Sequence, residues 1–147
     1  MNVVIIGGVA AGTKAAAKLK RMDQTIRITL LSRDKDISYA GCGLPYYVGG
    51  AIESRGELIV NTPKKYTALT GVTVHTGREA FRLDSAQRQI FAKNLENGEE
   101  EVYPYDACVV AAGASSIVPP LPGVQAEGVF KMRTPDDAEQ LRTYLTA

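Results

Sequence analysis

Cys42 is the residue of this sequence whose setting best suits chemistry. It lies between Gly41 and Gly43 in the segment 38–47, which reads Ser-Tyr-Ala-Gly-Cys-Gly-Leu-Pro-Tyr-Tyr. The thiolate of a cysteine is its nucleophilic form. The other cysteine, Cys108, is too far along the chain to form a CxxC redox pair, so we interpret Cys42 as a single redox-active or nucleophilic thiol. The alternative is a small buried hydrophobic residue, which suits the flanking glycines less well.

A glycine-rich turn upstream of Cys42 predicts a dinucleotide site. It reads Gly7, Gly8, Val9, Ala10, Ala11 and Gly12. Compared with the pattern GxGxxG, only the middle glycine is missing, where Val9 stands; the first glycine suits a tight turn and the third suits close packing of helix on strand. A pyrophosphate would bind the backbone amides at the start of the helix. An ordinary strand-to-helix turn is the alternative. A thiol near such a site suggests a thiolate working beside a flavin or nicotinamide, since glycines let the backbone approach a flat ring.

The residues that follow the second expected strand leave the type of dinucleotide open. An acidic residue usually stands there and binds the adenosine ribose, but this chain has Ser32 and Arg33. Serine followed by arginine suits a 2′-phosphate, and hence NADP. Asp34 is the alternative ribose partner.

Three basic residues form one stripe of the first expected helix. Lys14, Lys18 and Arg21 are spaced at i, i+4 and i+7, whereas Ala16 and Leu19 belong to a different, inward-facing stripe. Basic side chains pair well with phosphate groups. The stripe is therefore either a solvated helix face or a patch for a phosphorylated substrate that reaches Cys42.

Composition limits the classes of protein to consider. The chain has 147 residues, 45% hydrophobic and 22% charged, with a net charge of +1. These values predict a globular domain with no bulk attraction to nucleic acid or membrane. The two separated cysteines and the absence of a signal-like N-terminus favour a reducing cytoplasm. His75, the only histidine, has no neighbours at metal-ligand spacing, so no metal site is predicted.

The pattern of the whole chain predicts an α/β fold of Rossmann type. Asn2–Ile6, Thr13–Met22 and Ile26–Leu31 form a strand-helix-strand unit. A short helix is expected after Cys42, and a second helix begins at Pro63 with Thr62 as its cap. A strand Val72–His75 and an antiparallel meander (78–84, 89–94 and 101–105) follow. The last expected strand is buried, spans Tyr105–Ala112 and holds Cys108 in the core. A helix opens at Thr134 and Pro135 after a proline-rich stretch. We therefore expect a parallel sheet with crossover helices and a small antiparallel meander, in a three-layer ββα arrangement.

Five stretches of the chain, taken in order, resemble the single-cysteine branch of the flavoprotein pyridine nucleotide-disulfide oxidoreductases. They are Ile5–Gly12, Ser38–Tyr47, Val109–Ala114, Pro119–Gly123 and Arg133–Ala138. The most similar members are coenzyme A-disulfide reductases, CoA persulfide reductases and related NADH oxidases. The Cys-Gly-Leu-Pro-Tyr-Tyr stretch is the most specific part of this resemblance.

The resemblance implies FAD as cofactor, with NAD(P)H as the electron donor of the full-length enzyme. It places the FAD pyrophosphate on Gly7–Gly12, the adenosine near Ser32, Arg33 and Ala80, and the flavin beside Cys42, Ala111, Ala112, Gly113, Ala114 and Arg133. Cys42 would alternate between a thiolate and a mixed disulfide with CoA or a persulfide. Lys14, Lys18 and Arg21 match positions that hold the CoA phosphates. Ser38 and Gly41 match positions near the pantetheine thiol.

Three positions depart from the pattern of this family. Ser32 replaces a usual glutamate that binds FAD, and Gly41 stands where CoA-disulfide reductases often have asparagine. Ala10 stands where NADH peroxidases have a histidine, which argues against peroxidase chemistry.

The family resemblance also implies that the chain is the N-terminal part of a longer enzyme. Residues 1–147 correspond to part of an FAD-binding domain: 1–113 the core and meander, 114–134 a linker, and 135–147 the start of the crossing to an NAD(P)H domain. Members are homodimers whose later domains complete the site, so we expect this part to be inactive by itself. The alternatives are an NADH oxidase of the same family, an NADP-binding module, or a non-catalytic domain that binds a nucleotide or CoA.

Overall fold

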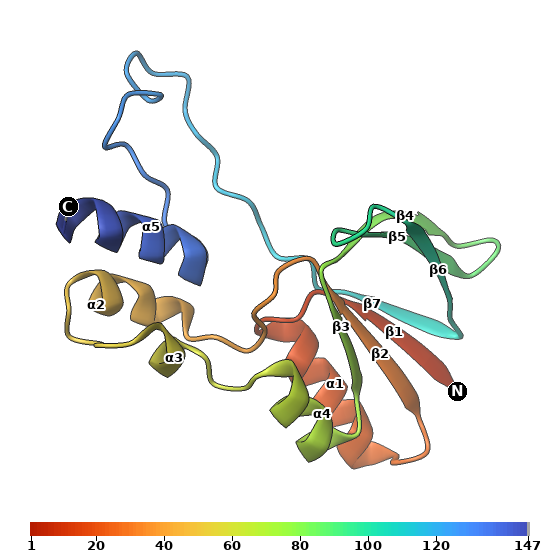
Figure 1. Cartoon of the computed structure of the whole chain (residues 1–147). Coiled ribbons are helices and arrows are strands. Elements are labelled where there is room, and N and C mark those ends of the chain that lie inside the picture. Colours follow the sequence, from red (N-terminus) through yellow and green to blue (C-terminus); the bar gives the residue numbers. More distant parts are fainter. Residues whose placement is uncertain (147) are drawn as a thin grey trace. The chain divides into compact units, whose positions relative to one another are not determined.

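The computed structural model describes residues 1–146, which form two compact units (Figure 1). Unit 1 consists of residues 1–38 and 61–112. Unit 2 consists of residues 39–60 and the residues from 113 onwards. The glycine-rich turn therefore belongs to unit 1, and Cys42 belongs to unit 2.

Unit 1 is built on a four-stranded parallel sheet with the strand order β3-β2-β1-β7. Its strands are β1 (Asn2–Ile6), β2 (Arg27–Ser32), β3 (Thr73–Thr76) and β7 (Ala107–Val110), and its helices are α1 (Ala11–Met22) and α4 (Pro63–Thr70). A second sheet is antiparallel and consists of β4 (Arg78–Asp84), β5 (Gln89–Asn94) and β6 (Glu100–Pro104). The α/β class and the antiparallel meander are confirmed.

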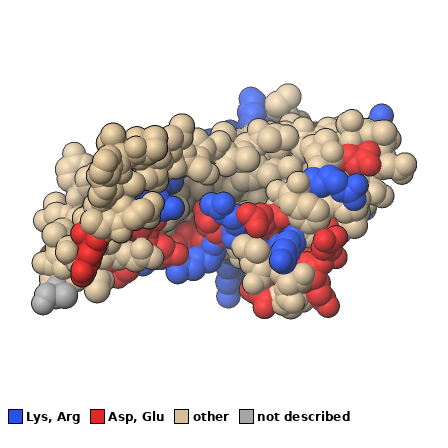
Figure 2. All heavy atoms as spheres, turned by 90° about the horizontal axis from the view of Figure 1, so that it is seen from above, with Lys and Arg blue, Asp and Glu red and all other residues tan. Residues whose placement is uncertain are grey.

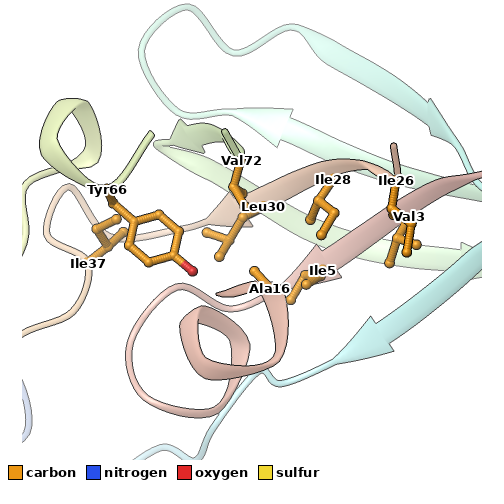
Figure 3. Packing of buried hydrophobic residues seen from close by; sticks show 9 residues of the cluster. All are labelled: Val3, Ile5, Ala16, Ile26, Ile28, Leu30, Ile37, Tyr66 and Val72. Carbon is orange, nitrogen blue, oxygen red and sulfur yellow. The ribbon is translucent and has the colours of Figure 1, made fainter. Parts of the chain in front are cut away.

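The alternation of side chains along β1 explains the three layers of unit 1. Val3 and Ile5 pack with Ala16 of α1 and Tyr66 of α4 in one buried cluster, drawn in Figure 3. Val4 points to the opposite face, where its cluster includes residues of β5. Helices cover one face of the parallel sheet and the meander covers the other (Figure 1).

Local signals set the limits of α4 as the sequence predicts. The Thr62 hydroxyl accepts a hydrogen bond from the Lys65 amide (3.2 Å), and Pro63 begins the helix. Gly71 follows the last turn in the left-handed conformation, at φ 71°. Tyr66 fixes α4 to α1, because its hydroxyl donates to the Thr13 carbonyl oxygen (2.5 Å).

The last strand of the parallel sheet differs from the prediction of a buried strand over Tyr105–Ala112. It covers only Ala107–Val110, and Val110 is 67% exposed. The reason is its place at the edge of the sheet, where only β1 pairs with it. Cys108 is accordingly half-buried instead of a full core residue, and burial raises the pKa of its thiol.

Several element limits also differ from the sequence prediction. Helix α1 begins at Ala11, inside the predicted turn, and β2 and β3 are each displaced by one residue toward the C-terminus. One short helix, α3 (Arg55–Leu58), was not predicted. It starts with a capping box in which the Glu57 carboxylate accepts from the amide of Ser54 (2.8 Å), a signal that the sequence carries.

Unit 2 consists of short helices around a small apolar core. A single 3₁₀ turn, η1 (Gly41–Gly43), leads into α2 (Leu44–Val48), and the last helix is α5 (Pro135–Thr146). The core contains Leu44, Tyr47, Leu58 and Ala138. Residues 113–134 form no helix or strand. The division of the chain into a core, a linker and a crossing segment stays a prediction. At the start of α5, Thr134 and Asp137 cap each other, since each side chain accepts from the other's amide (3.2 and 2.8 Å).

A half-buried polar network contributes a pH-dependent part of the stability of unit 1. The Glu101 carboxylate accepts hydrogen bonds from the Tyr103 hydroxyl, from Asn94 Nδ2 (3.1 Å) and from Arg78 Nε (3.3 Å). The hydrogen bond from Tyr103 lowers the pKa of Glu101, and Arg78 adds to this effect against the opposing effect of burial. Burial, with the neighbouring Glu101, raises the pKa of Tyr103 to about 12.

Replacing Glu101 by glutamine is expected to lower the free energy of unfolding by about 1–2 kcal/mol at neutral pH. A carboxyl group whose pKa is lower in the folded state stabilises the protein above its unfolded pKa, and this contribution is lost as pH falls through the folded pKa. The difference between variant and wild type should therefore shrink below about pH 4 in urea unfolding. Glu100→Gln, at an exposed position of the same strand, is the control. A difference that stays constant across this pH range would contradict the assignment.

Candidate functional site

The glycine-rich turn connects β1 to α1, and two of its glycines are required by packing. Gly7 has φ 106°, and a Cβ atom there would lie 2.1 Å from the Ala111 carbonyl oxygen. A Cβ atom on Gly12 would lie 1.9 Å from the Gly7 carbonyl oxygen. Both distances are far below van der Waals contact, so the turn tolerates no side chain at either place. The close approach also brings Ala111 and Ala112 against the turn.

The start of α1 is open to an anion. Ala10 is the N-cap residue, and no side chain in the described part of the chain caps it. No acidic residue lies in the first helical turn. The Thr13 hydroxyl instead points backward and donates to the Val9 carbonyl oxygen (2.5 Å). The first amides of the helix lack intrahelical partners, so the turn has the donors and the field that a pyrophosphate requires.

Ser32 lies directly beside the turn, but its side chain is buried. It is 4% exposed, and a Cβ atom on Gly8 would lie 3.0 Å from the Ser32 Cβ atom. The same Cβ atom on Gly8 would lie 2.8 Å from the Cγ2 atom of Ile37. A short side chain at position 32 therefore packs under Gly8. The predicted contact of Ser32 with an adenosine stays a prediction.

Arg33 and Ala80 lie at neighbouring parts of unit 1. Arg33 pairs with the carboxylates of Asp34 (3.4 Å) and Glu79 (3.9 Å), and Ala80 follows Glu79 on β4. The pairing of β4 with β5 shifts register just after Ala80. The structure thus brings together the two residues expected at an adenosine. It also pairs Arg33 with Glu79, a contact that sequence reasoning did not identify.

Ser38 is linked to the glycine-rich turn by its backbone. It has φ 50°, an uncommon conformation for serine, and its amide donates to the Gly8 carbonyl oxygen (3.0 Å). Asn61 holds it from the other side, since the Asn61 amide donates to the Ser38 carbonyl oxygen (3.4 Å) and its Nδ2 to the Ser38 hydroxyl (3.3 Å). No pattern in the sequence marks Asn61 as this partner, because the two residues lie 23 positions apart.

The basic stripe lies on the exposed side of α1. Lys14, Lys18 and Arg21 are all exposed, whereas Ala16 is buried and Leu19 is half-buried. The predicted division of the helix into two faces is confirmed. The exposure of the three side chains agrees with both interpretations, a solvated helix face and a patch that binds phosphate groups.

In unit 2, Cys42 lies in the middle of the 3₁₀ turn and its side chain is exposed. Hydrogen bonds fix the turn: the Gly43 amide donates to the Ala40 carbonyl oxygen (2.9 Å), and the Ala40 amide donates to the Leu58 carbonyl oxygen (2.8 Å). The two flanking glycines differ in packing. A Cβ atom on Gly43 would lie 3.1 Å from Leu58, whereas one on Gly41 would meet nothing within 4 Å. Open space therefore lies beside Gly41, the residue that precedes Cys42.

Arg133 folds back onto the residues that follow unit 1. Its Nε atom donates to the Ala114 carbonyl oxygen (3.1 Å), and a Cβ atom on Gly113 would lie 3.3 Å from its guanidinium. Its own amide donates to the Asp137 carboxylate (3.0 Å). The structure thus brings Gly113, Ala114 and Arg133 together within unit 2, while Ala111 and Ala112 belong to unit 1.

Other kinds of site are not found in the described residues. Residues 1–146 contain no group of three His, Cys, Asp or Glu residues arranged to hold a metal ion. No helix among them has the length and apolar character needed to cross a membrane. Figure 2 shows acidic and basic side chains interspersed on the face that it presents.

Comparison with known proteins decides the family. The model of the pyridine nucleotide-disulphide oxidoreductases matches residues 1–147. The chain belongs to this family. This match confirms the resemblance noted in the sequence. Members of the family depend on FAD and use NAD(P)H.

Relatives and solved structures of this oxidoreductase agree with that assignment. The chain is 35% identical over 144 residues to the NAD(P)H coenzyme A polysulfide/persulfide reductase of Pyrococcus horikoshii, and 32% identical over 145 residues to an NADH oxidase of Methanocaldococcus jannaschii. These matches cover 98% and 99% of the chain but 31% and 32% of the relatives. The structure of reduced Bacillus anthracis CoADR-RHD has a TM-score of 0.95 at 32% identity, covering 99% of this chain and 26% of that chain. The chain thus spans about a third of the length of the two relatives.

Proposed function

We propose that this oxidoreductase chain is the FAD-binding N-terminal part of an NAD(P)H-dependent reductase that acts on CoA disulfide or CoA persulfide through Cys42. The observation that carries the proposal is the exposed Cys42 thiol in a hydrogen-bonded 3₁₀ turn, in a chain of this family. A structural cysteine would be expected inside an apolar core, as Cys108 partly is. Relatives named as a coenzyme A polysulfide/persulfide reductase and a coenzyme A disulfide reductase support the substrate class.

The glycine-rich turn fits the pyrophosphate of FAD. Gly7 and Gly12 leave no room for a Cβ atom, and the uncapped start of α1 supplies amide donors. Bound FAD would supply the chemistry of accepting a hydride from NAD(P)H and passing two electrons to sulfur. Arg33 and Ala80 would contact its adenosine, and Ala111, Ala112, Gly113, Ala114 and Arg133 its flavin.

The chain's own chemical step is thiol-disulfide exchange at Cys42. The Cys42 thiolate attacks one sulfur of CoA disulfide, the sulfur-sulfur bond breaks, and one CoA leaves as a thiolate. A mixed disulfide of Cys42 with the second CoA remains. Two electrons then reduce this bond, and they release the second CoA thiolate and restore the Cys42 thiolate. The exposure of Cys42 and the open space beside Gly41 suit the entry of a disulfide.

The exposed basic stripe would hold the phosphates of CoA. Replacing Lys14 and Lys18 together by glutamate is expected to raise the KM for CoA disulfide about tenfold or more, because each lysine would lose a charge-assisted contact with phosphate. The kcat should change much less, since neither side chain would touch the reacting sulfur atoms. Steady-state kinetics of the full-length enzyme measures both constants.

The matched control for the stripe is Lys64→Glu, a charge reversal at an exposed position of α4. It should leave the KM for CoA disulfide close to that of the wild type. An equal KM for the stripe variant and the wild type would mean that the stripe is only a solvated helix face.

Anaerobic titration of the full-length protein with NADH and NADPH tests the proposed function. The flavin spectrum should bleach on reduction, and a long-wavelength charge-transfer band between thiolate and flavin should appear when two electrons have been added. Colourless protein that binds no flavin would overturn the proposal, and would leave Ser32 and Arg33 as support for an NADP-binding module.

An NADH oxidase is the second candidate, because a relative with that name is 32% identical over 145 residues. The two candidates differ in the electron acceptor. Rapid NADH consumption with oxygen, unchanged by CoA disulfide or CoA persulfide, would favour the oxidase.

A further inference from the structure

A cluster of polar contacts joins the segment that carries Cys42 to the last helix of unit 2. We call Tyr47, Arg55, Glu139 and Arg142 the Tyr47 clamp. The Tyr47 hydroxyl donates to the Glu139 carboxylate (3.0 Å), and Arg55 Nε pairs with the same carboxylate (3.5 Å). The Arg142 guanidinium lies over the Tyr47 ring, 4.5 Å from its centroid. All four residues belong to unit 2.

The Tyr47 clamp acts on the short helix that follows Cys42 directly. The 3₁₀ turn Gly41–Gly43 runs without a break into α2, which ends at Val48. A helix of five residues is too short to be stable by itself. Its position therefore depends on what it packs against, and Leu44 and Tyr47 pack with Leu58 and Ala138 of unit 2.

Packing does little to restrain the side chain of Cys42 itself. Its side chain is exposed, and a Cβ atom on the neighbouring Gly41 would meet nothing within 4 Å. Tyr47, five residues later, is 4% exposed. Besides the backbone hydrogen bonds of the turn, the segment is therefore restrained through the buried Tyr47, which contacts α5.

The contacts of Arg142 extend the restraint beyond α2. Its NH1 atom donates to the carbonyl oxygens of Ile52 (3.3 Å) and Glu53 (3.0 Å), which follow the helix. Burial raises the pKa of Tyr47, and the neighbouring Glu139 adds to this effect. The hydroxyl therefore stays protonated and remains a donor to Glu139.

We propose that the Tyr47 clamp positions the Cys42 thiol, with Glu139 of α5 as the positioning residue. The inference rests on the proposed function, in which Cys42 is the redox-active thiol. Glu139 acts through Tyr47 and does not touch the substrate. A displacement of Glu139 on α5 is then transmitted through the Tyr47 hydroxyl to α2, which directly follows the turn that carries the thiol.

Two variants of the full-length protein test the proposal. Tyr47→Phe removes only the hydroxyl, and Glu139→Gln removes the charge while keeping the size of the side chain. Tyr103→Phe is the matched control, since it also removes a tyrosine hydroxyl that donates to a glutamate, but in the meander of unit 1. Arg142→Met serves the same test if either clamp variant fails to fold.

The first measurement is amide hydrogen exchange, which needs neither flavin nor substrate. The amides of Gly43, Gly49 and Gly50 are hydrogen-bonded within the segment. We expect them to exchange about tenfold faster in the clamp variants, while the amides of β1 and β2 keep their wild-type rates. Equal acceleration in the segment and in the sheet, or no acceleration in either, would overturn the proposal.

The second measurement is the thiolate-flavin charge-transfer band of the reduced protein. We expect a weaker band in both clamp variants at unchanged flavin content, and a band of wild-type strength in Tyr103→Phe. A band of wild-type strength in the clamp variants would overturn the positioning role. Absence of the band from the wild type would overturn the proposed function instead, and hydrogen exchange would still decide whether the clamp holds the segment.

Discussion

Replacing Cys42 by serine is expected to abolish the NAD(P)H-dependent reduction of CoA disulfide, with a fall in kcat of about 10³-fold or more. A serine hydroxyl is a far weaker nucleophile toward sulfur than a thiolate, and it forms no mixed disulfide. The flavin should still be reduced by NAD(P)H, because that step does not need the thiol. Anaerobic steady-state kinetics and spectra of the full-length enzyme measure both effects.

Cys108→Ser is the matched control for this variant. Cys108 is half-buried on β7 and its neighbours belong to the apolar cluster on the meander side of the sheet. The control should retain the charge-transfer band and nearly full activity, at some cost in stability. Substantial CoA disulfide reduction by Cys42→Ser would mean that another group carries the chemistry.

Replacing Gly12 by alanine is expected to remove FAD binding and to lower the free energy of unfolding by about 3 kcal/mol or more. The added Cβ atom would lie 1.9 Å from the Gly7 carbonyl oxygen and 3.2 Å from Ile5. The first contact is with backbone, which cannot turn aside as a flexible side chain would. Helix α1 must therefore move away from β1, and the amides that the pyrophosphate requires move with it. Chemical unfolding and the flavin content of the purified protein measure the two effects.

Gly56→Ala is the control for the turn variant. Gly56 lies in α3, and a Cβ atom there would meet nothing closer than the Ser54 hydroxyl at 3.8 Å. Alanine in a helix is favourable, so stability should be unchanged or slightly higher. Wild-type flavin content in Gly12→Ala would show that the tight packing of the turn is not needed for the cofactor.

The sequence determined those features that depend on a few neighbouring residues. The glycine-rich turn, the Thr62 cap before α4 and the start of α5 after Thr134 all follow from local backbone chemistry, and the structure has them where they were predicted. A short continuous apolar run predicted β1, and helical spacing predicted the exposed basic stripe. The family followed from motifs that stand in order along the chain.

Only the tertiary structure decided features that depend on partners far apart in sequence. Central strands and edge strands can have the same apolar sequence pattern. The exposure of Val110 therefore followed only from the strand order, which places β7 at an edge. The burial of Ser32 depends on Gly8 and Ile37, which fill the space around it. Tyr47 and Glu139 lie 92 positions apart, and no local pattern pairs them. Such contacts arise from packing between elements, which is where the support of the Cys42 segment comes from.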